Sequence, residues 1–64
     1  MFDIISGKKM ENGIVVFWLE DESKKYDSFT YQELIDLKVN AFDLLNNPQN
    51  YGIDTSTRTI KSKV

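Results

Sequence analysis

Ten carboxylates are the main ionisable groups of this chain, and two of them, Asp21 and Asp27, flank a short charged segment. Paired carboxylates can perform acid–base chemistry when they are buried close together. Asp21 lies inside the acidic run Glu20–Glu22, however, and such a run is typical of a solvated turn. We therefore expect no catalytic carboxylate pair here.

Two segments have part of the ligand spacing of a calcium loop. Asp21, Ser23 and Asp27 form the first, which lacks the required glycine and contains lysines. The second begins at Asn47, and Arg58 stands where the closing glutamate is needed. Histidine and cysteine, the usual zinc ligands, are both missing from the chain. We expect no metal site and no cofactor.

The same composition argues against an enzyme. Histidine is the commonest general base in enzymes and cysteine the most reactive nucleophile, and the chain contains neither. A core of this size also rarely encloses a substrate cleft of about 300 Å³. We expect neither catalysis nor a small-molecule substrate.

The length of 64 residues predicts one small domain over residues 1–64. Such a domain buries only about 60% of its unfolded surface, so its stability is marginal. With disulfides and a histidine or cysteine metal site excluded, good packing or association with a partner must supply the stability.

Two β-strands are predicted, over residues 2–10 and 14–20, around the hairpin signal Asn12-Gly13. The second strand is apolar at every position from Ile14 to Leu19, which predicts a central strand buried on both faces. Its register stays open, because a two-residue loop places Trp18 opposite Gly7, whereas a three-residue loop places Leu19 opposite Ile5.

The segment around Thr30 has the complete signature of a helix start. Thr30 and Glu33 match a capping box, and Phe29 and Leu34 occupy the positions of a hydrophobic staple. The pattern predicts one helix from about Thr30 to Asn46, ended by the following asparagine and proline.

Two flanking segments have a less definite pattern. Residues 26–29 form a short strand or an extended lead into the helix, and residues 57–63 form an edge strand or a loose tail. The predicted fold class is α+β: a small single-layer antiparallel sheet, made of the N-terminal hairpin and a C-terminal edge strand, packed against one helix.

The predicted strand and helix both have more apolar surface than one sheet-and-helix contact can cover. We assign the excess to a partner-binding surface, either for another protein or for a second copy in a homodimer. The residues expected there are Val16, Trp18, Leu37 and Leu44.

Charged residues suggest two alternatives. Arg58, Lys61 and Lys63 form a C-terminal basic group that could bind nucleic acid, although the net charge of −2 makes this less probable than protein contact. Conversely, an acidic helix face could imitate nucleic-acid phosphates as an inhibitor of a basic protein. The residues of that face would be Glu33, Asp36 and Asp43.

The chain lacks a membrane-spanning apolar run and a signal-peptide pattern, which favours a cytoplasmic protein without membrane contact. Its composition, rich in Asn, Lys, Asp and Ile, is typical of short reading frames carried by phages and mobile elements. The sequence thus predicts a small, non-enzymatic binding or regulatory protein that acts through protein–protein contact.

Overall fold

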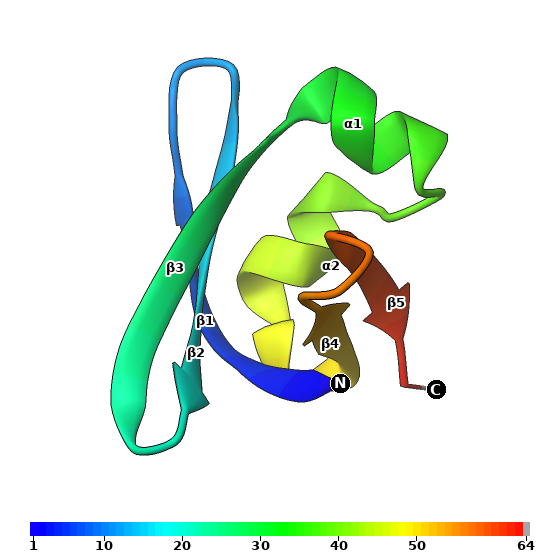
Figure 1. The fold of residues 1–64 in the computed structure, drawn as a ribbon. Helices are drawn as coiled ribbons and strands as arrows, with labels where there is room; N and C mark the ends of the chain where they lie inside the picture. The colour runs from blue at the N-terminus through cyan, green and yellow to red at the C-terminus, as the bar shows by residue number, and fades with distance from the viewer. Residues whose placement is uncertain (64) are drawn as a thin grey trace.

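A five-stranded antiparallel sheet, curled into a half-barrel, forms the frame of the computed structural model, which describes residues 1–63 (Figure 1). The strands are β1 (Phe2–Lys9), β2 (Gly13–Glu20), β3 (Ser23–Thr30), β4 (Tyr51–Asp54) and β5 (Thr59–Ser62). Two short helices, α1 (Tyr31–Asp36) and α2 (Ala41–Asn46), and a 3-10 turn (Pro48–Asn50) connect β3 to β4. The predicted α+β class is confirmed, while the sheet has more strands than predicted.

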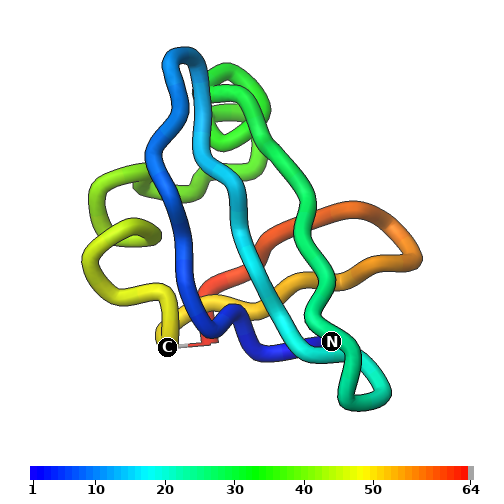
Figure 2. Tube along the Cα trace, turned by 90° about the vertical axis from the view of Figure 1, so that its left-hand side faces the viewer, coloured from blue at the N-terminus to red at the C-terminus, as the bar shows by residue number. Residues whose placement is uncertain are grey.

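The curl of the sheet depends on β1, which pairs with two neighbours in the order β3-β2-β1-β4-β5. Most of β1 pairs with β2, and its first residues Phe2 and Asp3 pair with β4. A bulge at Ile5 interrupts the pairing with β2 between Ile4 and Ser6, next to the residues that pair with β4, and bulges bend a strand. Figure 2 shows the result: β1, β2 and β3 run side by side, and β4 and β5 cross them at a steep angle.

The β1–β2 register differs from both predicted alternatives. Lys9 pairs with Ile14, Gly7 with Val16 and, beyond the bulge, Ile4 with Trp18. The Met10 amide donates to the Gly13 carbonyl at 2.8 Å, so the hairpin is centred on Glu11-Asn12 and not on Asn12-Gly13. Gly13 has no positive φ, so its role is different from that of a tight-turn glycine. A Cβ at Gly13 would lie 2.1 Å from the Phe29 carbonyl oxygen, so only glycine lets β2 approach β3 there.

The core lies on the concave side of the sheet, beneath the two helices. Its buried apolar residues are Ile4, Ile14, Val16, Trp18, Phe29, Leu34, Val39, Leu44, Tyr51, Ile53 and Ile60. Within β2 the buried positions alternate, so Ile14, Val16 and Trp18 point inward. The prediction that β2 is buried on both faces is therefore wrong.

The predicted single helix is also wrong, because the helix breaks between Asp36 and Ala41. Lys38 adopts a left-handed conformation with φ 61°. The Val39 amide donates to the Leu34 carbonyl and the Lys38 amide to that of Ile35, which together form a Schellman motif. Val39 and Leu34 are both buried, so their apolar contact favours this ending.

A second helix start follows the break. The Asn40 side chain accepts a hydrogen bond from the Asp43 amide and so caps α2. The first start matches the prediction in detail: both capping-box hydrogen bonds of Thr30 and Glu33 form, and both staple residues are buried.

The remaining segments settle the open alternatives. Residues 26–29 belong to a full-length strand, β3, and Thr59–Ser62 forms the edge strand β5. Asp21 and Glu22 connect β2 to β3 with φ of 51° and 67°, which is the conformation of a type I′ turn made without glycine.

Candidate functional site

The convex side of β1, β2 and β3 carries a layer of side chains that the core does not use. Residues paired across an antiparallel sheet point to the same face. The register places Ser6 beside Phe17 and Tyr26, Lys8 beside Val15 and Ser28, and Leu19 beside Lys24. We call this surface the outer face: Ser6, Lys8, Met10, Val15, Phe17, Leu19, Lys24, Tyr26 and Ser28.

The outer face is apolar at its centre and hollowed. A shallow depression of about 400 Å³ is lined by Met10, Val15, Phe17, Tyr26, Asp27 and Ser28. Tyr26 is 72% exposed and Leu19 is 53% exposed, although both are large apolar side chains. The Phe17 and Tyr26 rings lie 6.1 Å apart between centroids and are tilted by 42°.

The charged side chains at the paired outward positions are both lysines, Lys8 and Lys24. Asp27 also lines the depression, and its carboxylate is held by Arg58 and the Ser28 amide. The Lys24 ammonium lies 5.1 Å from the centroid of the Phe17 ring, which is a cation–π distance. Lys8 and Lys24 are exposed, and neither forms an ion pair with any of the described residues 1–63. No aspartate or glutamate occupies the paired outward positions of these strands.

The residues predicted as the partner surface lie elsewhere. Val16 and Leu44 are 0% exposed, Trp18 is 5% exposed, and Leu37 is partly buried against the core. These four positions stabilise the fold and do not present a free surface. The strand alternation explains the error, since every residue from Ile14 to Leu19 is apolar and the pattern cannot say which set points inward.

The predicted acidic row is divided by the helix break. Glu33 and Asp36 belong to α1, whereas Asp43 belongs to α2. The Asp43 carboxylate accepts hydrogen bonds from the Tyr51 hydroxyl at 2.6 Å and from the side-chain amide of Asn47 at 2.9 Å, and these bonds lower the pKa of Asp43. The same contact raises the pKa of Tyr51 to about 12. Asp43 therefore has a structural partner.

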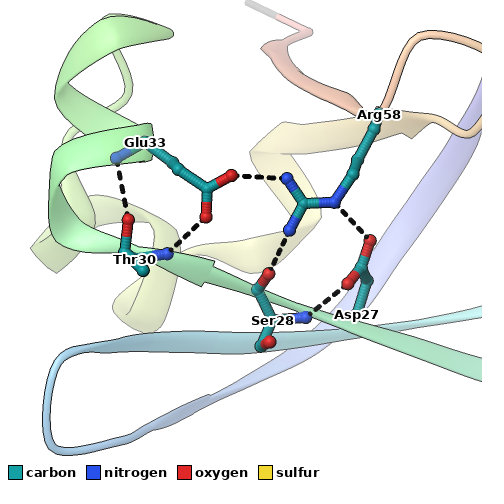
Figure 3. A network of polar contacts seen from close by, with 5 residues as sticks. All are labelled: Asp27, Ser28, Thr30, Glu33 and Arg58. Carbon is teal, nitrogen blue, oxygen red and sulfur yellow. Dashed lines mark hydrogen bonds and ion pairs between the residues drawn. The ribbon is translucent and has the colours of Figure 1, made fainter.

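Arg58, predicted as a nucleic-acid contact, also has protein partners (Figure 3). Its guanidinium forms ion pairs with Asp27 at 3.0 Å and with Glu33, donates to the Ser28 carbonyl, and stacks 4.3 Å from the Phe29 ring centroid. The hydrogen bond from Arg58 is the largest cause of a lowered pKa at Glu33.

This arrangement, which we call the Arg58 network, covers part of the β3 edge. Ser28 has its carbonyl bonded by Arg58 and its amide bonded by the Asp27 carboxylate. The Thr30 amide donates to Glu33. Backbone amide and carbonyl groups on the edge of a sheet can pair with another strand when nothing else bonds them. Figure 3 shows that the network also joins β3 to the loop before β5, across the opening of the half-barrel.

The other two predicted basic residues do not complete a cluster. Lys63 forms an ion pair with Asp3 at 3.1 Å, while Lys61 is exposed on β5. Arg58 and Lys63 thus both face carboxylates of this chain, and the structure does not bring Arg58, Lys61 and Lys63 together as a free cationic surface.

Within residues 1–63, no group of three or more acidic side chains is placed to hold a metal ion. A second shallow cleft, of about 200 Å³, lies beside the Arg58 network and is lined by Phe29, Glu33, Asp36, Leu37 and Arg58. No helix in the described part of the chain is both long and apolar enough to cross a membrane.

Comparisons with known proteins add no family: no protein-family model matches the chain, and searches of curated proteins and of solved structures give no significant match. Sequence reasoning missed the outer face, although one signal could have identified it. In the segment Lys24 to Ser28, Tyr26 is the large apolar residue out of phase with the buried Phe29, so it must point to the opposite side.

Proposed function

We propose that the protein is a small, non-catalytic binding protein that acts by contact between its outer face and another protein. The observation that carries the proposal is the exposure of Leu19 and Tyr26 beside the half-buried Phe17, on a sheet face that no helix or strand of residues 1–63 covers. Contiguous exposed apolar surface on a small protein often marks an interaction site. Aromatic residues and methionine are enriched in such interfaces.

Neither alternative function has comparable support. A nucleic-acid site at Arg58, Lys61 and Lys63 would have to compete with the carboxylates that already pair with Arg58 and Lys63. A phosphate-mimicking row would need acids on one continuous face, and the helix break divides them.

Site-specific photo-crosslinking in the native host tests the proposal. A photoreactive amino acid replaces Tyr26 in one variant and the exposed Gln49, on the 3-10 turn, in a matched control. We expect discrete adducts with protein from position 26 and none from position 49. Adducts from both positions equally, or from neither, would refute a partner surface on the outer face.

If the partner is a second copy of the chain, the outer face forms the interface of a homodimer. Sedimentation equilibrium over a wide concentration range measures it directly, because association makes the apparent mass rise with concentration. The variant Tyr26→Glu places a charge at the centre of the outer face and should abolish such association. A mass that stays monomeric at all concentrations excludes the homodimer.

A further inference from the structure

We infer that the outer face binds an acidic, amphipathic segment of a partner protein, with an apolar side chain in the depression and carboxylates beside Lys8 and Lys24. This inference rests on the proposed function, because it names the chemistry of the partner for the same surface.

The depression provides the apolar half of the recognition. Its apolar walls are Met10, Val15, Phe17 and Tyr26, and its volume of about 400 Å³ has room for a large side chain. The acidic residue of the lining, Asp27, has its charge balanced by an ion pair with Arg58 at 3.0 Å. Phe17 is only partly buried, so an inserted side chain would cover apolar surface that now faces water.

The two lysines provide the charged half. Residues paired across the three strands form rows on the outer face. Lys8 on β1 belongs to the row of Val15, and Phe17 on β2 belongs to the next row. Lys24 on β3 belongs to the row after that, beside Leu19. Lys8, Phe17 and Lys24 therefore form a diagonal across the three strands. A segment that follows this diagonal passes over the ring and meets an ammonium group on each side. Because neither lysine has an ion-pair partner among residues 1–63, both charges are available to external carboxylates.

Charge also favours an acidic segment over two other occupants of the outer face, a second copy of the chain and a nucleic-acid strand. Two copies stacked through their outer faces would bring four lysines together, and the carboxylate that lines the depression, Asp27, is already paired with Arg58. A nucleic-acid strand running along the β-strands would meet Glu11 at one hairpin turn and Asp21 and Glu22 at the other, which repel phosphates. A short segment along the diagonal stays between these turns.

Selection from a random peptide library on the immobilised full chain tests the inference. We expect enriched peptides to carry an apolar residue with aspartate or glutamate on both sides. Titration of an enriched peptide into isotope-labelled protein should shift the amide signals of Val15, Phe17 and Tyr26. Affinity should fall about fivefold to tenfold in the variant Lys8→Gln/Lys24→Gln, which removes two exposed charge pairs.

The matched control is Lys38→Gln/Lys61→Gln, which makes the same charge change at exposed positions outside the outer face and should leave affinity unchanged. Three results would overturn the inference. The selected peptides could be neutral or basic, or the wild type could enrich no peptides beyond those that the Tyr26→Glu variant enriches. The third result is an unchanged peptide affinity in Lys8→Gln/Lys24→Gln. Displacement of the peptide by oligothymidylate at lower concentration would make single-stranded nucleic acid the occupant.

The photo-crosslinking experiment separates this inference from the proposed function. An adduct yield from position 26 that is undiminished in the Lys8→Gln/Lys24→Gln background would overturn the acidic segment and leave protein contact intact. Absence of adducts in both backgrounds would overturn the proposed function and, with it, the inference.

Discussion

Arg58 and Glu33 lie 25 positions apart in the chain, and their ion pair holds the loop before β5 against the first turn of α1. The same guanidinium bonds Asp27 and the Ser28 carbonyl on β3. No strand pairing closes the half-barrel between β3 and β5, since these strands stand at opposite ends of the sheet order. The side-chain contacts of Arg58 therefore join the two edges of the half-barrel.

The variant Arg58→Ala should lower the free energy of unfolding by about 1 kcal/mol, through loss of the contacts with Phe29 and Asp27. The effect stays modest because the Arg58 side chain is 46% exposed and water screens its ion pairs. Urea unfolding measures the change. Lys61→Ala removes an exposed cation that forms no ion pair with any of residues 1–63, and it should have no effect. Equal losses in both variants would refute the closing role of Arg58.

The Arg58 network should also make stability depend on pH. Hydrogen bonding to Arg58 lowers the pKa of Glu33 from its ordinary value of 4.5. A lowered pKa in the folded state means stabilisation that is fully present above pH 4.5 and is lost as pH falls through the folded pKa. Thermal melts of the wild type and Arg58→Ala should therefore converge under acid conditions. A constant gap between their melting temperatures across this range would contradict the prediction.

Gly13→Ala should be strongly destabilising, by about 2–4 kcal/mol, because the new methyl group meets backbone that cannot move aside cheaply. Its Cβ would lie 2.1 Å from the Phe29 carbonyl oxygen and 2.9 Å from the Thr30 Cα. Gly7→Ala is the matched control, since its nearest new contact is an ordinary 3.5 Å to Ile14. Circular-dichroism melts compare the two; similar stabilities would show that β2 and β3 do not approach as described.

Lys38→Gly should stabilise the protein by about 0.5–1 kcal/mol. Lys38 has φ 61° at the end of α1, a conformation that glycine adopts without the steric cost of a Cβ. Lys38→Ala keeps the Cβ and should give no gain, so the pair separates backbone strain from loss of the lysine charge. A melting temperature that rises equally in both variants would mean that the charge, and not the conformation, is responsible.

Tyr51 should ionise only at about pH 12, because its hydroxyl donates to the Asp43 carboxylate. A raised pKa in the folded state means stabilisation that is present below the ordinary value of 10.0 and is lost as pH rises toward 12. Asp43→Asn should move the titration of Tyr51 back toward 10.0, as followed by tyrosinate absorbance. A tyrosinate titration that Asp43→Asn leaves unchanged would argue against the Tyr51–Asp43 contact.

The elements that sequence reasoning predicted well are those specified by neighbouring residues. The capping box of Thr30 and Glu33 needs only residues three positions apart, and both of its hydrogen bonds form. The β1–β2 hairpin was similarly visible as a local pattern, although its register was not, and the edge strand β5 was one of the two alternatives predicted for residues 57–63. The end of α1 was local as well, but its left-handed position holds Lys38 where glycine would have signalled it.

The face on which a residue lies was decided by tertiary structure. In the run Ile14 to Leu19, a shift of one residue exchanges the buried and exposed sets, so the sequence alone could not choose between Val16 with Trp18 and Val15 with Phe17. The choice is seen only in the tertiary packing, where Val16 and Trp18 share one buried cluster with Leu34 of α1 and Leu44 of α2.

The same distinction applies to charge. Composition by itself determined that the chain lacks histidine and cysteine and has a net charge of −2. Whether a given charge is available to a partner depends on which residues the curled sheet brings beside it. Folding pairs Arg58 with Asp27 and Glu33 and gives Lys8 and Lys24 no ion pair with a carboxylate of residues 1–63. Ion pairs form over a few ångströms in space and do not depend on separation along the chain.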